Sequence, residues 1–131
     1  MDLRLSNKVV IVTGGAKGIG AAICTTLAEE GAIPVIMDKD ETAGNSLREA
    51  IGGRAIFVCT DLTDPLQCKS AIDQVIDTFG NLYGVVNNAG ANDGVGLENG
   101  TPARFLASMT GNAGHFYFVV HAALPWLKKS E

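Results

Sequence analysis

Residues 13–20 decide the fold, and they read Thr-Gly-Gly-Ala-Lys-Gly-Ile-Gly. They follow an unbroken β-branched run at residues 9–12 and open an amphipathic segment, so the order is strand, glycine turn, helix. Gly14 lets the chain turn out of the strand, Gly18 lets the backbone approach a pyrophosphate, and Gly20 lets the helix pack closely on the strand. The stretch therefore predicts a phosphate-binding turn, in which the helix start presents N–H groups to an anion.

The surroundings of the glycines indicate which phosphate ligand is expected. Asp38 ends the next predicted strand, at the distance that a ribose-binding carboxylate needs. A P-loop would need Gly-Lys followed by Ser or Thr, whereas here Lys17 precedes Gly18. We therefore expect a dinucleotide rather than a nucleoside triphosphate.

Length and composition are those of one globular domain, covering residues 1–131, with 47% hydrophobic and 18% charged residues. The net charge of −4, with Lys and Arg scattered, predicts no nucleic-acid partner. Three widely spaced cysteines show no metal-type pairing, so we expect no metal site and reduced, packed thiols in a cytoplasmic protein. The apolar run near the N-terminus is too short to span a membrane, so we expect no membrane partner.

Apolar periodicity predicts strands alternating with helices. Mostly apolar strands joined by helices imply an α/β fold, a Rossmann-type doubly wound parallel sheet with helices on both faces. Right-handed crossovers give the strand order 3-2-1-4 and a crevice between the first and fourth strands. The expected strands are 8–13, 32–37, 55–59 and 82–86, and the expected helices are 18–30, 41–50, 64–79 and 101–129.

Two helices carry more specific expectations. The first should bury Ile19, Ile23 and Leu27, which recur at fourfold spacing. The last is long and mostly apolar, and we expect kinks at its glycines, Gly111 and Gly114, and at Pro125.

Four motifs in the right order resemble the short-chain dehydrogenase/reductase family. The motifs are the glycine turn of residues 13–20, Asp61-Leu62 after the third strand, Asn87-Asn88-Ala89-Gly90 after the fourth, and Asn112 in the last helix. Residues 87–97 further resemble the branch that contains L-fucose dehydrogenases.

The resemblance implies a role for each motif residue. Asp61 would accept a hydrogen bond from the adenine amino group, and Leu62 would add a main-chain contact. Asn112 would be the catalytic asparagine, which interrupts the helix locally and holds a water in a proton relay. The implied cofactor-binding set is Gly14, Lys17, Gly18, Ile19, Gly20, Asp38, Asp61, Leu62, Asn88, Ala89 and Gly90.

Charge argues for the identity of the cofactor. A carboxylate at Asp38 can bind both ribose hydroxyls but would repel a 2′-phosphate, which favours NAD. Lys17 and Lys39 are placed where basic residues in relatives meet that phosphate, so NADP is the alternative. The other interpretation, which we favour, is that both are solvated surface lysines.

Other polar residues have two readings. Asn92, Asp93 and Glu98 could bind sugar hydroxyls, or they could simply form turns. His115 and His121 have no visible activating partner, which favours core or interface packing over catalysis.

The last helix is apolar on more than one face. In the resembled family this helix packs in the subunit interface, so we expect a homo-oligomer, a dimer or tetramer. The apolar set is Phe105, Leu106, Met109, Phe116, Tyr117, Val120, Leu124 and Leu127.

The family's later catalytic residues, a serine and a Tyr-x-x-x-Lys pair, do not occur before Glu131. Neither Tyr83 nor Tyr117 is followed by the required lysine. We therefore expect the cofactor-binding half of a longer enzyme, inactive by itself. The whole enzyme would transfer hydride between a secondary alcohol or ketone, such as the sugar L-fucose, and NAD(P). The alternatives are a 3-oxoacyl-acyl-carrier-protein reductase and a non-catalytic nucleotide-binding fragment.

Overall fold

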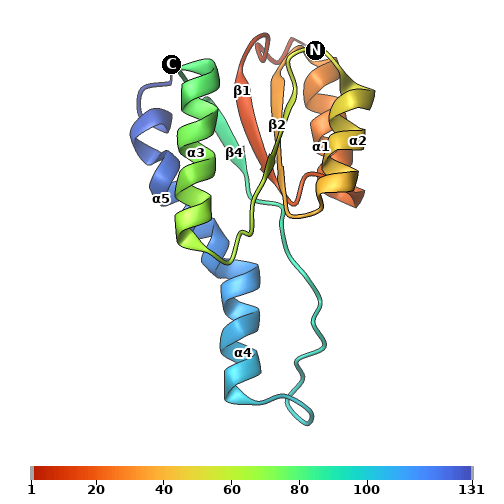
Figure 1. Cartoon of the computed structure of the whole chain (residues 1–131), viewed down its shortest axis with the longest axis vertical. Coiled ribbons are helices and arrows are strands. Elements are labelled where there is room, and N and C mark those ends of the chain that lie inside the picture. Colours follow the sequence, from red (N-terminus) through yellow and green to blue (C-terminus); the bar gives the residue numbers. More distant parts are fainter. Residues whose placement is uncertain (1, 131) are drawn as a thin grey trace.

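Strand β1 (Val9–Thr13) is buried along its whole length at the centre of a parallel sheet. The computed structural model describes residues 2–130 (Figure 1). Within them the sheet has the order β3-β2-β1-β4, which confirms the predicted topology. The other elements are α1 (Gly18–Glu29), β2 (Ile33–Asp38), α2 (Glu41–Ile51), β3 (Ile56–Cys59), α3 (Pro65–Phe79), β4 (Gly84–Val86), α4 (Pro102–Met109), a π-helical turn η1 (Thr110–Gly114) and α5 (His115–Leu127).

Helices cover the two faces of the sheet in pairs (Figure 1). On one face, α3 and α5 pack against Val9 and Ile11 through side chains such as Ile72 and Val119. On the other face, α1 and α2 cover Val12 and Ile36, and Cys24 of α1 lies in that core. The doubly wound arrangement follows from strands that are apolar on both faces.

The face that α1 buries differs from the predicted one. Ile19 is 75% exposed, whereas Gly20 and Cys24 are buried against the sheet. Only glycine fits at the close approach of helix and strand, so Gly20 faces inward and the preceding residue points outward. Ile23 and Leu27 are half-buried beside the same core.

Strand β4 is shorter than predicted, because its ladder with β1 pairs only Val10–Val12 with Gly84–Val86. The backbone N–H of Tyr83 still donates to the Val9 carbonyl at 2.9 Å. Tyr83 therefore precedes the strand rather than lying within it.

The predicted last helix is divided into α4, η1 and α5. The interruption falls at residues 110–114, which contain the glycines expected to kink it. Pro125 lies inside α5, two residues before the helix ends. Helix α4 buries no residue, and with the loop of residues 91–100 it projects away from the sheet (Figure 1).

None of the helices formed by residues 2–130 is long and apolar enough to cross a bilayer.

Candidate functional site

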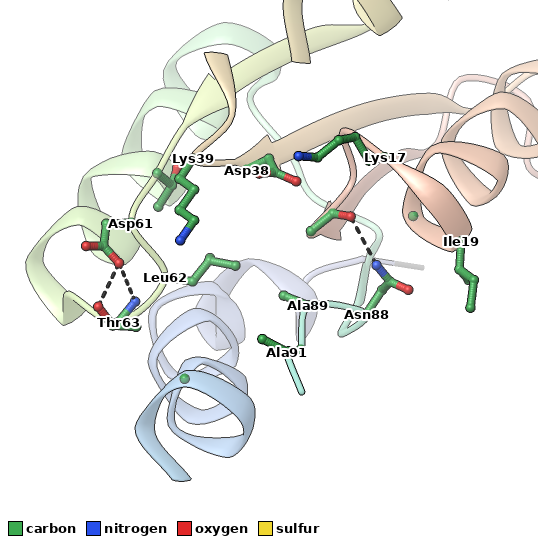
Figure 2. A pocket seen from close by; sticks show the side chains of 15 residues that line it. Lys17, Ile19, Asp38, Lys39, Asp61, Leu62, Thr63, Asn88, Ala89 and Ala91 are labelled. Atoms are coloured by element: carbon green, nitrogen blue, oxygen red, sulfur yellow. Dashed lines mark hydrogen bonds between the residues drawn. The ribbon is translucent and has the colours of Figure 1, made fainter. Parts of the chain in front are cut away.

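A cavity of about 530 Å³ lies beyond the carboxyl ends of the strands (Figure 2). Such a position is where open α/β sheets bind ligands. Every residue of the predicted cofactor-binding set except Gly18 lines it. The lining is Gly14, Lys17, Ile19, Gly20, Asp38, Lys39, Thr60, Asp61, Leu62, Thr63, Asn88, Ala89, Gly90, Ala91 and Gly111.

The glycine turn is compact on one side and open on the other. A Cβ at Gly20 would collide with the carbonyl oxygen of Gly14 and would lie 2.7 Å from Nδ2 of Asn88. Gly18 has φ +56°, and a Cβ there would meet nothing within 4 Å. The turn thus packs tightly against the protein while leaving space in front of Gly18.

The start of α1 offers backbone donors at this open side. The first hydrogen bond that closes the helix runs from Ala21 N to Lys17 O, at 3.2 Å. The N–H groups of residues 18–20 precede that bond and have no place in the helical ladder. Together with the helix dipole, they suit a pyrophosphate.

A network of hydrogen bonds joins the end of β4 to the end of β1. Asn88 Nδ2 donates to the carbonyls of Thr13 and Gly14, both at 3.1 Å. In return, Thr13 Oγ1 accepts from the backbone N–H groups of Asn88 and Ala89, both at 3.1 Å. This network fixes Asn88 and Ala89, which form the floor of the cavity, to the glycine turn.

Asp38 lies between the glycine turn and α2. Its Oδ2 accepts from Ala16 N at 3.1 Å, and its Oδ1 accepts from Asp40 N at 3.0 Å. A carboxylate has about four acceptor positions, so these bonds leave room for two ribose hydroxyls.

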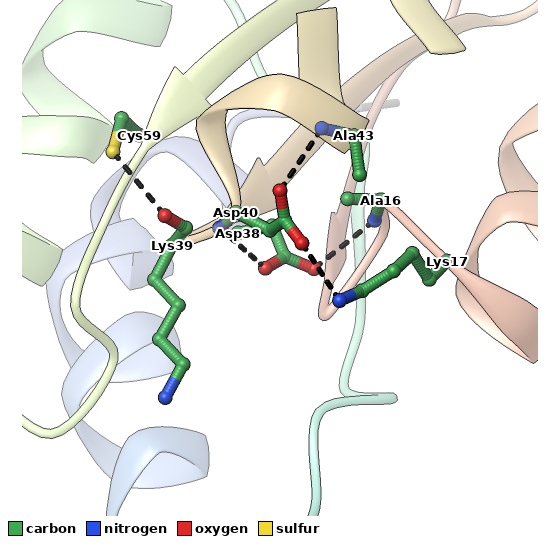
Figure 3. Close-up of polar contacts among 7 residues, drawn as sticks. All are labelled: Ala16, Lys17, Asp38, Lys39, Asp40, Ala43 and Cys59. Atoms are coloured by element: carbon green, nitrogen blue, oxygen red, sulfur yellow. Dashed lines mark hydrogen bonds and ion pairs between the residues drawn. The ribbon is translucent and has the colours of Figure 1, made fainter. Parts of the chain in front are cut away.

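Two lysines stand beside Asp38 with different surroundings (Figure 3). Lys17 Nζ lies 2.7 Å from Asp40 Oδ2, and both side chains are partly exposed. Lys39 extends separately from the end of β2 and lines the cavity. Both lysines are predicted candidates for binding a 2′-phosphate, and the ion pair of Lys17 with Asp40 is not evident from the sequence.

Asp61 begins the turn that leads into α3. Its Oδ1 accepts from Thr63 N at 2.9 Å and from Thr63 Oγ1 at 2.7 Å. These bonds hold the pKa of Asp61 below its ordinary value of 3.8, so the carboxylate is ionised at neutral pH. It can therefore accept a hydrogen bond from an amino group.

Asn112 lies in the π-helical turn, and its side chain contacts the loop after β4. Its Oδ1 accepts from Ala91 N at 2.7 Å, and its Nδ2 donates to Ser108 O at 3.1 Å. Asn112 is not among the lining residues, although its neighbour Gly111 is. The predicted local interruption of the helix at Asn112 is present.

His115 is buried, with only 2% of its surface exposed, and packs under the same loop. Its Nε2 lies 2.8 Å from the carbonyl of Ala89, and across residues 2–130 Nδ1 has no hydrogen-bond partner. The expected packing role fits this placement. His121 is exposed and stacks on Tyr117, with the ring centroids 5.2 Å apart.

Asn92 and Asp93 do not line the cavity. Asn92 Oδ1 accepts from Gly94 N at 3.2 Å, and Asp93 Oδ1 accepts from Val95 N at 3.3 Å. A hydrogen bond from Ser108 is the main cause that lowers the pKa of Asp93. The two backbone contacts are those of turn formers, the second of the two readings, whereas the contact with Ser108 joins the loop to α4.

Several functional residues were missed in the sequence. Thr13 and Thr63 act by binding the backbone or a neighbouring carboxylate, and Asp40 acts as the N-cap of α2. The pattern Asp-x-Thr at residues 61–63 is typical of an Asx turn, and it could have predicted that Thr63 donates to Asp61. The cysteines also differ from expectation, because Cys24 and Cys68 are buried but Cys59 is exposed.

Comparison with known proteins agrees with this geometry. A model of the short chain dehydrogenase family matches residues 8–131. The chain belongs to the short-chain dehydrogenase family. The short-chain dehydrogenases are a family of oxidoreductases.

Several of the curated relatives are named dehydrogenases. The chain is 38% identical to L-fucose dehydrogenase of Mus musculus over 129 residues, 98% of this chain and 47% of the relative. It is 37% identical to a 2,5-dichloro-2,5-cyclohexadiene-1,4-diol dehydrogenase of Sphingobium indicum, over 99% of this chain and 53% of the relative. The chain thus spans about half the length of the curated relatives it matches.

Solved structures show the same fold. The crystal structure of the dehydrogenase Cj0485 aligns with a TM-score of 0.90 and 37% identity, over 98% of this chain and 50% of that one. The ligand-free aldohexose dehydrogenase of Thermoplasma acidophilum aligns with a TM-score of 0.85 and 27% identity, over 98% of this chain and 47% of that one.

Proposed function

We propose that this chain forms the cofactor-binding part of an NAD-dependent dehydrogenase that acts on a secondary alcohol. The observation that carries the proposal is the cavity itself. It brings together the glycine turn, the carboxylate of Asp38 and the ionised carboxylate of Asp61 at the carboxyl ends of the strands.

The residues present fit a nicotinamide dinucleotide. The space in front of Gly18 and the donors at the start of α1 suit the pyrophosphate, and Asp38 suits the ribose hydroxyls. Asp61 and Leu62 would hold the adenine, and the loop of residues 88–90 would line the second ribose. When bound, the nicotinamide supplies the hydride chemistry.

The charges favour NAD over NADP, since a 2′-phosphate at Asp38 would meet a carboxylate. Isothermal titration of the purified chain with NAD and with NADP tests this preference. We expect tighter binding of NAD, and Asp38→Ala should narrow the difference about tenfold. Asp77→Ala, which removes an exposed carboxylate of α3 outside the cavity, serves as the control. Tighter binding of NADP by the unaltered chain would contradict the choice of NAD.

For the substrate we propose a sugar, because several curated relatives are named L-fucose dehydrogenases. Asn92 and Asp93, in the loop of residues 91–100, are the residues of this chain that we propose to contact the sugar hydroxyls. A 3-oxoacyl-acyl-carrier-protein reductase would use the same cofactor residues. Turnover with L-fucose or with an acyl thioester by the full-length protein separates these two enzymes.

The catalytic acid or base is not supplied by the described tyrosines. Tyr83 packs under Lys8 Nζ at 4.8 Å, Tyr117 stacks on His121, and neither lines the cavity. We propose that Asn112 helps to relay a proton, and that a tyrosine beyond residues 1–131 completes the site. Binding of NAD by this chain without turnover of any alcohol would support that division of roles, and it would equally suit the alternative of a non-catalytic fragment.

We also propose a cytoplasmic homo-oligomer formed through the last helices. Phe105, Leu106 and Met109 on α4 and Phe116 and Tyr117 on α5 are all exposed. Light scattering of Leu106→Glu against the unaltered chain tests the assembly, because a charge in an apolar interface should shift it to the monomer.

A further inference from the structure

An ion pair crosses the rim of the cavity beside Asp38. Lys17 comes from the glycine turn, and its Nζ lies 2.7 Å from Oδ2 of Asp40, at the start of α2 (Figure 3). The backbone on both sides also holds Asp38, since Ala16 N and Asp40 N each donate to its carboxylate. The pair therefore lies directly next to the carboxylate that we assign to the ribose.

Asp40 is fixed in place by a second role. Its Oδ1 accepts from Ala43 N at 2.9 Å and so caps α2, which leaves Oδ2 directed at Lys17. The side chain of Asp40 is 34% exposed and that of Lys17 is 68% exposed, so Lys17 is the more exposed partner. Their hydrogen bond lowers the pKa of Asp40 and raises that of Lys17, so both are charged at neutral pH.

We propose that Asp40 is a specificity-determining residue, which holds Lys17 in an ion pair and so favours NAD over NADP. The inference rests on the proposed function of the cavity. A 2′-phosphate beside Asp38 would meet two carboxylates, and it would have to displace Asp40 to gain Lys17. Lys39 lines the cavity without this restraint, so the balance between the two cofactors depends on whether Lys17 is released.

Asp40→Asn isolates the charge from the cap. Asparagine caps a helix as well as aspartate does, so α2 should keep its start while Lys17 loses its ionic partner. Titration calorimetry with NAD and NADP should show the affinity ratio move about tenfold toward NADP. Asp40→Ser, another capping residue without charge, should give the same shift. Asp64→Asn is the matched control, because Asp64 caps α3 outside the cavity lining and should leave the ratio unchanged.

Lys17→Met shows whether Asp40 acts through Lys17. In that background Asp40→Asn should change the ratio by about threefold or less, since only direct repulsion by Asp40 remains. An unchanged ratio in Asp40→Asn and Asp40→Ser, with both nucleotides still bound, would overturn the inference alone. An equally large shift without Lys17 would also overturn it. Failure of the unaltered chain to bind either nucleotide would overturn the proposed function, and the inference with it.

Discussion

Helices α3 and α4 begin in the same way and end in different surroundings. Each has a capping side chain followed by proline, Asp64-Pro65 in α3 and Thr101-Pro102 in α4, and each carries apolar residues at helical spacing. Helix α3 buries Ile72 and three other residues against the sheet and α5, whereas α4 buries none. Local sequence therefore starts a helix, but the burial of its apolar side depends on what the rest of the assembly supplies.

The largest expected difference between the two helices is the cost of losing an apolar side chain. Ile72→Ala in α3 should lower the free energy of unfolding by about 3 kcal/mol, because it leaves a cavity in a closed core. Leu106→Ala in α4 should change it by less than about 0.5 kcal/mol, because the side chain is 64% exposed. Urea unfolding of the monomer measures both. Equal losses would show that α4 is packed in solution.

The caps sharpen the same comparison at a smaller scale. Asp64→Ala should lower the free energy of global unfolding by about 1 kcal/mol, because α3 is part of the core. Thr101→Ala should weaken only α4, so its amides should exchange faster while global unfolding stays unchanged. Hydrogen exchange followed by mass spectrometry distinguishes the two. A global loss from Thr101→Ala would contradict the separation of α4 from the core.

The turn that leads into α3 should make a contribution to stability that depends on pH. Thr63→Ala removes a hydroxyl bond to Asp61 and should move the pKa of Asp61 up toward 3.8. Because the folded pKa is lowered, Asp61 stabilises the fold above its unfolded pKa, and this contribution is lost as the pH falls through the folded value. In Thr63→Ala the contribution should be smaller, and its loss should be complete at a higher pH, because only the folded pKa has moved up. NMR titration of the Asp61 carboxyl carbon gives the shift, and Thr78→Ala on α3 is the control.

The rate of thiol labelling should distinguish the packed helices α1 and α3 from the exposed helix α4, with no change in stability. Burial raises the pKa of Cys68 in α3 to about 11 and that of Cys24 in α1 to about 12, so neither should react with iodoacetamide at neutral pH. A cysteine introduced as Ala107→Cys on α4 should react readily in the monomer, where α4 is exposed, as should the exposed Cys59. Rapid labelling of Cys68 in the native chain would show that α3 opens more often than its packing implies.

The sequence predicted most of the fold because the strands are apolar runs closed by glycines and caps. It predicted the strand order and most of the cavity lining, since the carboxyl ends of parallel strands meet at one edge. It misplaced Ile19, because periodicity alone does not say which side of a helix meets the strand, and the closest approach at Gly20 sets the rotation. The apolar pattern likewise did not predict that the β4 ladder is limited to Gly84–Val86.

Side-chain pairs were the least predictable part of the site. Lys17 and Asp40 are 23 residues apart, and only the right-handed crossover through α1 and β2 brings them together. Thr13 has the sequence features of an ordinary strand residue, and only the structure shows that it binds Asn88 in the loop after β4. Pairs of this kind depend on the register of neighbouring elements, which the composition of either segment alone does not contain.

The hydrogen-bond network between Thr13 and Asn88 also sets the order in which parts of the cavity can fold during synthesis. Its hydrogen bonds join positions 75 residues apart, so the glycine turn leaves the ribosome long before its anchor exists. A nascent chain that has emerged only as far as α3 can form β1, α1 and β2, yet the floor of its cavity has not been made. Closing so long a loop is slow relative to local pairing. The nascent chain should therefore become able to bind a ligand late and in one step, once residue 88 has left the ribosome and can fold.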